Sequence, residues 1–190
     1  MAPMVIMRGT PRAVEYYEIL KAELEERIAR GQAAVPGERF RLYWEGPPIW
    51  GALRPLASVF LEHQAAIVAS TYARNFALEG LDPQNPVESM ARTYTGTFPN
   101  RSDDYKAAFL SEQFKEYGVD AVVYHDGRTS PEHSNVRYGL ERRLRRETGL
   151  PSLVLDADTH DLRLFSLSQI QRQLSDFIGQ QEWAAAGALE

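Results

Sequence analysis

The sequence contains no cysteine, and this absence excludes several kinds of chemistry. Disulfide bonds, thiolate nucleophiles and cysteine-ligated metal ions all require cysteine side chains, which the chain does not have. Histidine is scarce as well, and none of the four has the partner that a His-Glu-x-x-His zinc helix requires. The histidines are His63, His125, His133 and His160. The residues therefore do not indicate a zinc site or a disulfide-stabilised domain.

Long hydrophobic runs and an excess of positive charge are also missing. No apolar run approaches the roughly eighteen residues that cross a bilayer. Arg8 and Pro11 interrupt the N-terminal segment where a signal peptide would have its hydrophobic region. The net charge of −5 gives no overall field that favours nucleic acid. These features predict a cytoplasmic protein with no membrane and no nucleic-acid partner.

The length and composition are those of one globular domain. The chain has 190 residues, of which 44% are hydrophobic and 25% are charged. A chain of this length can bury most of its apolar surface in one core. We expect a single α/β domain over residues 1–183. Residues 184–190 are rich in alanine and are expected to form a flexible tail, either natural or vector-derived.

Short apolar runs alternate with segments of helical periodicity along the chain. The runs contain β-branched and aromatic residues and end at turn residues, which is typical of buried strands. Alternating strands and helices predict a three-layer α/β fold, with a mostly parallel sheet of at least four strands and helices on both faces. The expected strands are Phe40–Trp44, Ala65–Ser70, Ala121–Tyr124 and Ser152–Asp156.

Polar or aromatic loops follow these strands, beginning near Glu45, Thr71, His125 and Asp158. Strands of a parallel sheet all end at the same edge, and ligands of open α/β sheets bind outside those carboxyl ends. We therefore expect the loops to share one mouth that binds a substrate or forms an interface. The candidate residues are Trp44, Glu45, Trp50, Tyr72, Asn75, His125, Arg128, Ser130, Asn135 and Asp158.

Two groups of side chains at this edge leave alternatives open. His125 and Asp126 either act as acid and base or form a hydrogen-bonded pair within their loop, which is the more common arrangement. Asp156, Asp158 and Asp161 either bind a divalent cation or cap helices and turns, and capping is again more common. A receiver domain would need a lysine at a late strand end, and none is so placed.

Other segments also have a packing interpretation beside a functional one. Trp44 and Trp50 either line an apolar pocket or seal the domain, and we favour sealing. The connection after Thr71, up to Asn100, is longer than a strand-to-helix connection requires, so it is a candidate lid or interface segment. The basic helix expected over Arg137–Thr148 either binds phosphate or forms a solvated face. The helix that begins at Pro11 either packs against the core or binds a partner, and we favour packing.

Several of these stretches, taken together, resemble the C-terminal half of benzoyl-CoA reductase subunits and 2-hydroxyacyl-CoA dehydratase subunits. The run Tyr124–Leu140 carries the resemblance, with Gly149–Arg163 and the helix that follows it. Any one of these motifs alone would be weak, but the resemblance extends from about residue 7 to residue 180. The other matching stretches are Arg8–Pro11, Arg41–Gly46 and Ser166–Ile178.

The resemblance implies a flavodoxin-like domain within a longer, two-domain subunit. Such subunits hold a [4Fe-4S] cluster through cysteines and act on an acyl-CoA thioester by low-potential electron transfer. An ATP-dependent activator delivers the electron. The implied partners are a missing N-terminal domain, a homologous partner subunit and that activator. The resemblance does not identify the acyl group. It also does not distinguish a reductase, which is an oxidoreductase, from a dehydratase, which is a lyase.

The sequence departs from this family pattern in two respects. The N-terminal half, which supplies cluster ligands and much of the acyl pocket, is missing. Ser130 stands where a cluster cysteine would be expected, and a serine hydroxyl is a poor ligand for iron. We therefore expect no cofactor in this chain and no activity from the chain alone. The alternative is a non-catalytic binding or assembly domain on the same fold.

Overall fold

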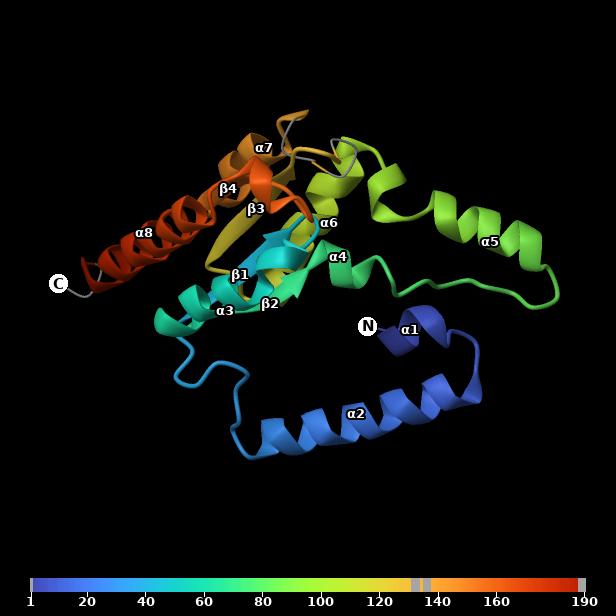
Figure 1. Ribbon diagram of the computed structural model, residues 1–190. Helices are drawn as coiled ribbons and strands as arrows, with labels where there is room; N and C mark the ends of the chain where they lie inside the picture. Colours follow the sequence, from blue (N-terminus) through green and yellow to red (C-terminus); the bar gives the residue numbers. More distant parts are fainter. Residues whose placement is uncertain (1, 131–133, 135–137, 188–190) are drawn as a thin grey trace.

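The computed structural model describes residues 2–130, 134 and 138–187. In this part of the chain the strands form one sheet in the order β2-β1-β3-β4, and every neighbouring pair is parallel (Figure 1). The chain moves outward from β1 to β2 and then crosses to β3, so the winding reverses between β1 and β3. This flavodoxin-like order confirms the predicted fold. The strands are β1 (Phe40–Glu45), β2 (Ala65–Ser70), β3 (Ala121–Gly127) and β4 (Ser152–Ala157).

The predicted strands are all present, but β3 continues beyond its apolar run. The prediction that a loop begins at His125 is wrong, because residues His125 to Gly127 pair with residues Leu155 to Ala157 of β4. The polar side chains favour a loop, whereas the backbone hydrogen bonds of a parallel ladder do not depend on side-chain polarity. Strands β1 and β4 each continue one residue beyond the predicted end as well.

The strands bury side chains on both faces of the sheet, as their alternating geometry requires. Leu42 and Val123 belong to a core cluster formed with α3 and α8. Tyr43 and Val122 belong to a second cluster, formed with α6 and α7 on the opposite face. The three-layer arrangement is therefore confirmed. The covering helices are α3 (Leu53–Glu62), α6 (Asp103–Glu116), α7 (Leu140–Thr148) and α8 (Leu167–Gly187).

Three helices begin at residues whose side chains cap the first turn. Thr10 and Ser102 accept hydrogen bonds from backbone nitrogens in the first turns of α2 (Pro11–Ala29) and α6. The Ser166 hydroxyl accepts one from Gln169 at the start of α8. Each cap satisfies a backbone donor that has no partner within its helix. Within the described residues, no helix combines the length and the apolar character that crossing a membrane requires.

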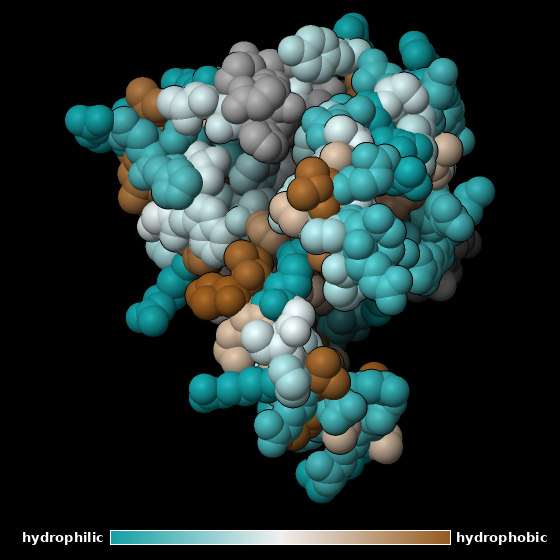
Figure 2. Space-filling model, turned by 90° about the vertical axis from the view of Figure 1, so that its right-hand side faces the viewer, coloured by the Kyte–Doolittle hydropathy of each residue, from teal (hydrophilic) through white to brown (hydrophobic). Residues whose placement is uncertain are grey.

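Helix α2 lies outside the core, so the expectation that it packs there is wrong. With α1 (Ala2–Ile6) it forms an arm beside the sheet, which Figures 1 and 2 show as a separate lobe. Val14, Leu24 and Ile28 share one side of α2 by helical spacing, yet their exposed fractions are 58%, 49% and 74%. The periodicity correctly indicates an amphipathic helix, but the described core does not cover its apolar side.

The long connection between β2 and α6 folds into a segment of its own. It contains α4 (Thr71–Arg74), α5 (Pro86–Thr95) and the short turn η2 (Phe98–Asn100). The ring of Phe98 is buried and lies 5.5 Å from the ring of Phe109 on α6. The segment is therefore anchored beside the carboxyl ends of β1 and β2. The remaining turns are η1 (Trp50–Ala52) and η5 (Leu162–Leu164).

Candidate functional site

The carboxyl edge of the sheet has two sides with different chemistry. The β3–β4 side consists of the loops after those strands, residues 128–130 and 158–164. The β1–β2 side consists of the loop after β1, residues 46–50, and the long connection over residues 71–100. The two sides meet where β1 and β3 lie next to each other, at the point where the winding reverses. In doubly wound sheets this edge is where ligands bind.

On the β3–β4 side, Arg128 is held by three hydrogen bonds to its neighbours. Its Nε and Nη2 atoms donate to the two carboxylate oxygens of Asp156, at 2.7 and 2.8 Å, and Nη1 donates to the carbonyl of Leu164. The hydrogen bonds and charge of Asp156 raise the pKa of Arg128 above its ordinary value. A bidentate pair of this kind fixes the guanidinium plane. Arg128 therefore fastens one loop to the next and has few donors left for a ligand.

Asp158 is likewise saturated by hydrogen bonds within this side. Its carboxylate accepts from both the hydroxyl and the backbone nitrogen of Thr129, and from the backbone nitrogens of His160 and Asp161 at 3.0 and 2.9 Å. These donors, led by the Thr129 hydroxyl, hold the pKa of Asp158 well below its usual range. Such an arrangement is a turn cap, which is the more common of the two alternatives considered for this residue.

The cation-site alternative for the aspartates finds no support in the geometry. Asp156 is paired with Arg128, and Asp161 is paired with Arg163, whose side chain and backbone lower the pKa of Asp161 to about 2. Among the described residues, no group of three or more histidine, aspartate or glutamate side chains is arranged to hold a metal ion. The acidic residues after β4 thus serve the local structure of their loop.

His125 connects the two sides from within β3. Its imidazole is buried, and Nδ1 donates to the carbonyl of Pro47 at 2.6 Å. Burial is the main influence on the pKa of His125 and lowers it, so the ring is neutral at neutral pH, with its proton on Nδ1. Gly46, with φ of +101°, permits this approach, because a Cβ there would lie 2.8 Å from the backbone oxygen of His125. The arrangement favours a structural role over acid–base catalysis.

On the β1–β2 side, a chain of hydrogen bonds is buried beneath the loops. Thr71 donates its hydroxyl proton to the carboxylate of Glu45, whose exposed fraction is 2%. The Tyr43 hydroxyl lies 2.8 Å from the same Thr71 oxygen and must be the donor, because the Thr71 proton is already used. Burial raises the pKa of Tyr43, which keeps its hydroxyl protonated. These three residues form a polar floor at the ends of β1 and β2.

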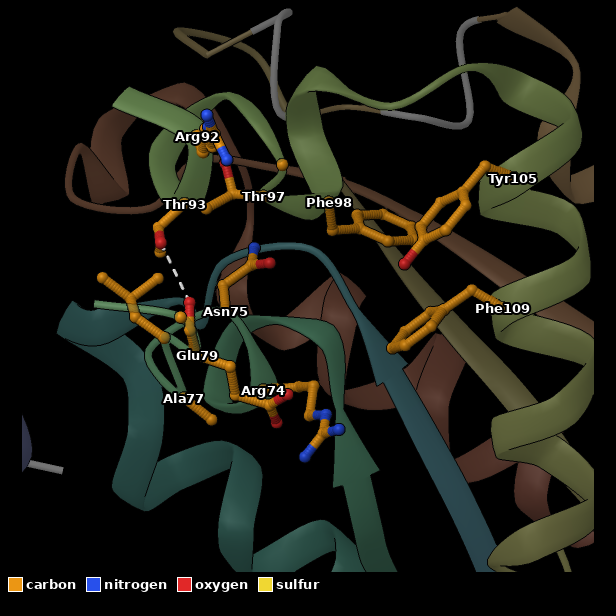
Figure 3. A pocket seen from close by; sticks show the side chains of 13 residues that line it. Arg74, Asn75, Ala77, Glu79, Arg92, Thr93, Thr97, Phe98, Tyr105 and Phe109 are labelled. Carbon is orange, nitrogen blue, oxygen red and sulfur yellow. Dashed lines mark hydrogen bonds between the residues drawn. The ribbon is translucent and has the colours of Figure 1, made fainter. Parts of the chain in front are cut away.

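Above this floor the β1–β2 side is hollow. Glu45, Thr71 and Tyr72 line a small cavity of about 30 Å³, together with Asn75 and Phe98. Asn75 and Phe98 also line a larger cavity of about 540 Å³, which Figure 3 shows. Because they line both spaces, the two cavities adjoin. The larger volume lies within the range of small-molecule sites. These two cavities, which described residues line, therefore lie on the β1–β2 side, next to the long connection.

The larger cavity has one aromatic wall and a polar, basic remainder. Figure 3 shows Phe98, Tyr105 and Phe109 together on one side and Arg74 and Arg92 at separate parts of the rim. Sequence reasoning missed most of this lining, and only Asn75 was among the candidates. Two signals were available in the sequence. They are the unusual length of the connection and the four-residue spacing of Tyr105 and Phe109, which places both rings on one face of a helix.

The other predicted site residues are dispersed around the edge. Trp44 is buried in the α3–α8 cluster, whereas Trp50 is 41% exposed and meets the ring of Tyr72 edge-on at 5.7 Å. Ser130 is half-buried just beyond β3, and its backbone nitrogen donates to the carbonyl of Gly127 at 3.3 Å. The residues that would test Ser130 as a helix cap lie outside the described residues, as does Asn135. The predicted set therefore does not converge on one cavity.

The parallel sheet and its strand order define a flavodoxin-like α/β domain, with a cavity beside the reversal point. The family model described as 2-hydroxyglutaryl-CoA dehydratase, D-component, matches residues 1–180. The chain therefore belongs to that family. This confirms the resemblance that the sequence motifs indicated.

Individual relatives agree with the family match. The chain is 28% identical over 191 aligned residues to one of the subunits of benzoyl-CoA reductase from Thauera aromatica, covering 95% of the chain and 44% of that protein. It is 30% identical over 175 residues to the (R)-phenyllactyl-CoA dehydratase alpha subunit of Clostridium sporogenes, covering 92% and 42%. It is 27% identical over 179 residues to the (R)-2-hydroxyisocaproyl-CoA dehydratase alpha subunit of Clostridioides difficile, covering 94% of the chain and 43% of that protein. The chain thus spans less than half the length of these relatives.

The side chains of this chain do not fit the iron–sulfur cluster that the resemblance implies. Cluster irons are held by thiolates, and the sequence has no cysteine. Ser130, at the expected cysteine position, offers a hydroxyl of high pKa. Any cluster would therefore depend on ligands that these 190 residues do not supply.

Proposed function

We propose that this chain is the C-terminal half of an acyl-CoA reductase or dehydratase subunit. In the complete assembly it acts on an acyl-CoA thioester by low-potential electron transfer, together with an N-terminal domain, a homologous partner subunit and an ATP-dependent activator. The observation that carries the proposal is the family match across residues 1–180, combined with the smaller span of the chain relative to its relatives.

Within that assembly, this chain contributes the β1–β2 side of the sheet edge. The buried Glu45 and Thr71 provide a fixed polar floor, and Tyr72 and Asn75 stand at the entrance to the cavity above it. These groups can bind and orient a substrate and exclude water from one side of it. The cluster and the chemistry that depends on it are assigned to the N-terminal domain and the partner subunit, because these 190 residues contain no thiolate.

The exposed apolar side of α2 supports the partner part of the proposal. Val14, Leu24 and Ile28 together expose a strip of large side chains, and the relatives contain additional sequence that this chain lacks. Burying each of these side chains would contribute about 1.5–3 kcal/mol, so leaving them in water is unfavourable. We propose that a domain of the kind that the longer relatives contain covers this strip.

A non-catalytic assembly domain remains the second candidate, and one observation favours it. Loop residues of the β3–β4 side, including Arg128 and Asp158, are already bonded to one another. With no cysteine, and with Arg128 near the expected cluster position already paired with Asp156, the domain can keep the fold and the interface without a redox role.

Genomic context and reconstitution distinguish the two candidates. We expect an adjacent reading frame to encode a cysteine-bearing partner of the same family. The chain and that partner should be purified together anaerobically and supplied with iron, sulfide, the activator, ATP and a low-potential reductant. Consumption of acyl-CoA that requires this chain supports the enzyme proposal. An assembly that forms but is equally active without this chain supports the non-catalytic alternative.

A further inference from the structure

The 540 Å³ cavity is built for a flat ring at one side. Tyr105 and Phe109 lie on successive turns of α6 with ring planes 12° apart and centroids 6.2 Å apart. Phe98 closes the wall, and its ring lies 5.5 Å from that of Phe109. Nearly parallel rings at a cavity surface provide a face on which a planar heterocycle can stack. Tyr105 is 40% exposed, so part of this wall is accessible from the cavity although Arg101 lies over one face of the Tyr105 ring.

The same cavity carries an excess of positive charge. Of the charged residues that line it, Arg74 and Arg92 are basic and Glu79 is acidic. The side chain of Arg74 forms no hydrogen bond or ion pair with the described residues. Arg92 uses its Nε for an exposed pair with Glu88, which is a weak interaction in water. Both guanidinium groups therefore retain donors for an anion.

A third arginine joins the aromatic wall to the basic rim. The guanidinium of Arg101 lies over the ring of Tyr105, 4.0 Å from its centroid. One of its nitrogens is also close to Gly96, which lines the cavity. Asn75 points into the same space and adds an amide that can both donate and accept hydrogen bonds (Figure 3). Stacking, anion pairing and amide recognition are thus available within one cavity.

We infer that this cavity binds an adenosine phosphate group, with the base on the wall of Phe98, Tyr105 and Phe109 and the phosphates at Arg74 and Arg92. Arginine pairs with phosphate in a fork-like geometry that lysine does not reproduce, and all three cations here are arginines. The volume is sufficient for a nucleoside diphosphate. The cavity adjoins the Glu45–Thr71 floor, so a group tethered to the nucleotide can extend toward the sheet edge.

The inference deepens the proposed function and rests on it for the source of the ligand. Coenzyme A contains an adenosine phosphate, and so does a free nucleotide such as adenosine 5′-diphosphate. Both sources share the chemistry that the cavity recognises. A thioester of coenzyme A would place its acyl end away from the basic rim.

Calorimetric titration of the purified chain tests the inference. The probes are adenosine 5′-diphosphate, coenzyme A, adenosine and pantetheine, each at low and high salt. We expect the two phosphate-bearing probes to bind, adenosine and pantetheine to bind at least about tenfold more weakly, and salt to weaken binding. If coenzyme A binds more tightly than adenosine 5′-diphosphate, the natural ligand is a coenzyme A thioester. If the diphosphate binds equally or more tightly, the natural ligand is a free nucleotide.

Three cavity variants and one control variant locate the binding. Arg74→Gln and Arg92→Gln should each weaken binding of the diphosphate about tenfold, because each removes a charge-assisted contact. Arg54→Gln, an exposed arginine of α3 outside the cavity lining, is the matched control and should leave binding unchanged. Urea denaturation curves confirm that each variant is folded. Tyr105→Leu tests the stacking wall independently and should also lower affinity.

Three results would overturn the inference. They are no binding of either phosphate-bearing probe, binding that none of the cavity substitutions weakens, and equal weakening by Arg54→Gln. Failure of the proposed function is recognised separately. Nucleotide binding without acyl-CoA consumption by the complete assembly would contradict the function alone, and consumption without nucleotide binding would contradict this inference alone.

Discussion

The β3–β4 side and the β1–β2 side end at the same edge of the same sheet, yet their polar groups are used differently. Beyond β3 and β4, Arg128 and Asp158 bind neighbouring loop atoms. Beyond β1 and β2, Asn75 and Arg74 border open space. Parallel topology brings the loops to one edge of the sheet. Whether a side chain there can bind a ligand depends on whether neighbouring loop atoms already occupy its hydrogen-bonding groups.

The largest expected effect on stability is at the β3–β4 side, where the carboxylate of Asp158 accepts several hydrogen bonds. Asp158→Ala should lower the free energy of unfolding by about 2–3 kcal/mol, because several donors of two loops lose their common acceptor. Urea denaturation measures this change. Asp158→Asn is the control and should retain part of the stability, since its amide oxygen still accepts. An unchanged unfolding free energy for Asp158→Ala would contradict the structural role.

The stabilising contribution of Asp158 should also be lost in acid. Its folded pKa lies below the ordinary 3.8, so the unfolded chain binds the proton first. The contribution is therefore present above about pH 4 and disappears as the pH falls below that value. Stability measured from pH 5 to pH 2 should fall less steeply in Asp158→Asn than in the unmodified chain.

A smaller effect is expected at the buried floor of the β1–β2 side. Thr71→Val removes the hydroxyl that links Tyr43 to Glu45 and should lower the free energy of unfolding by about 1–2 kcal/mol. Thr71→Ser keeps the hydroxyl and should remain close to the unmodified chain. If valine and serine were equally tolerated, the hydrogen-bond chain would not contribute to stability.

His125 joins the two sides and should make stability depend on pH near neutrality. Its folded pKa is lowered by burial, so the neutral ring is stable above its ordinary pKa of 6.5. As the pH falls below 6.5, the unfolded chain gains a proton before the folded chain does, and stability decreases. Denaturation curves at pH 7.5 and 5.5 measure this difference. His125→Asn should remove it, and a persistent difference in that variant would assign it to other groups.

The smallest effect is expected at the rim of the cavity. Arg74→Gln should change the free energy of unfolding by less than about 0.5 kcal/mol, because the exposed side chain has no partner among the described residues. A loss comparable to that of Asp158→Ala would show that the rim is structural, and the contrast between the two sides would not hold.

Much of the fold could be predicted from the sequence because its signals are local. Apolar runs give the strands, and Thr10 and Ser102 give the helix starts. Two features could not be obtained in this way. The end of β3 depends on pairing with β4, which the polar residues His125 and Asp126 do not indicate. The exposure of α2 depends on what it contacts, and an amphipathic pattern does not specify a partner.

The candidate site was predictable as an edge but not as a cavity. The strand exits correctly indicated Glu45, Asn75 and Asp158 as residues of the carboxyl edge. Sequence alone could not show that Asp158 is saturated, because its partners come from both its own loop and the loop after β3. The aromatic wall was missed for a related reason. Its residues follow no strand, and they reach the edge only because the long connection folds back beside it.

The contrast between the two sides is tested most directly by backbone and side-chain NMR during titration with adenosine 5′-diphosphate. The account predicts chemical-shift changes concentrated at Asn75, Phe98, Tyr105 and Phe109, with Arg128, Thr129 and Asp158 unchanged. Changes concentrated at Arg128, Thr129 and Asp158, with the cavity residues unaffected, would contradict it.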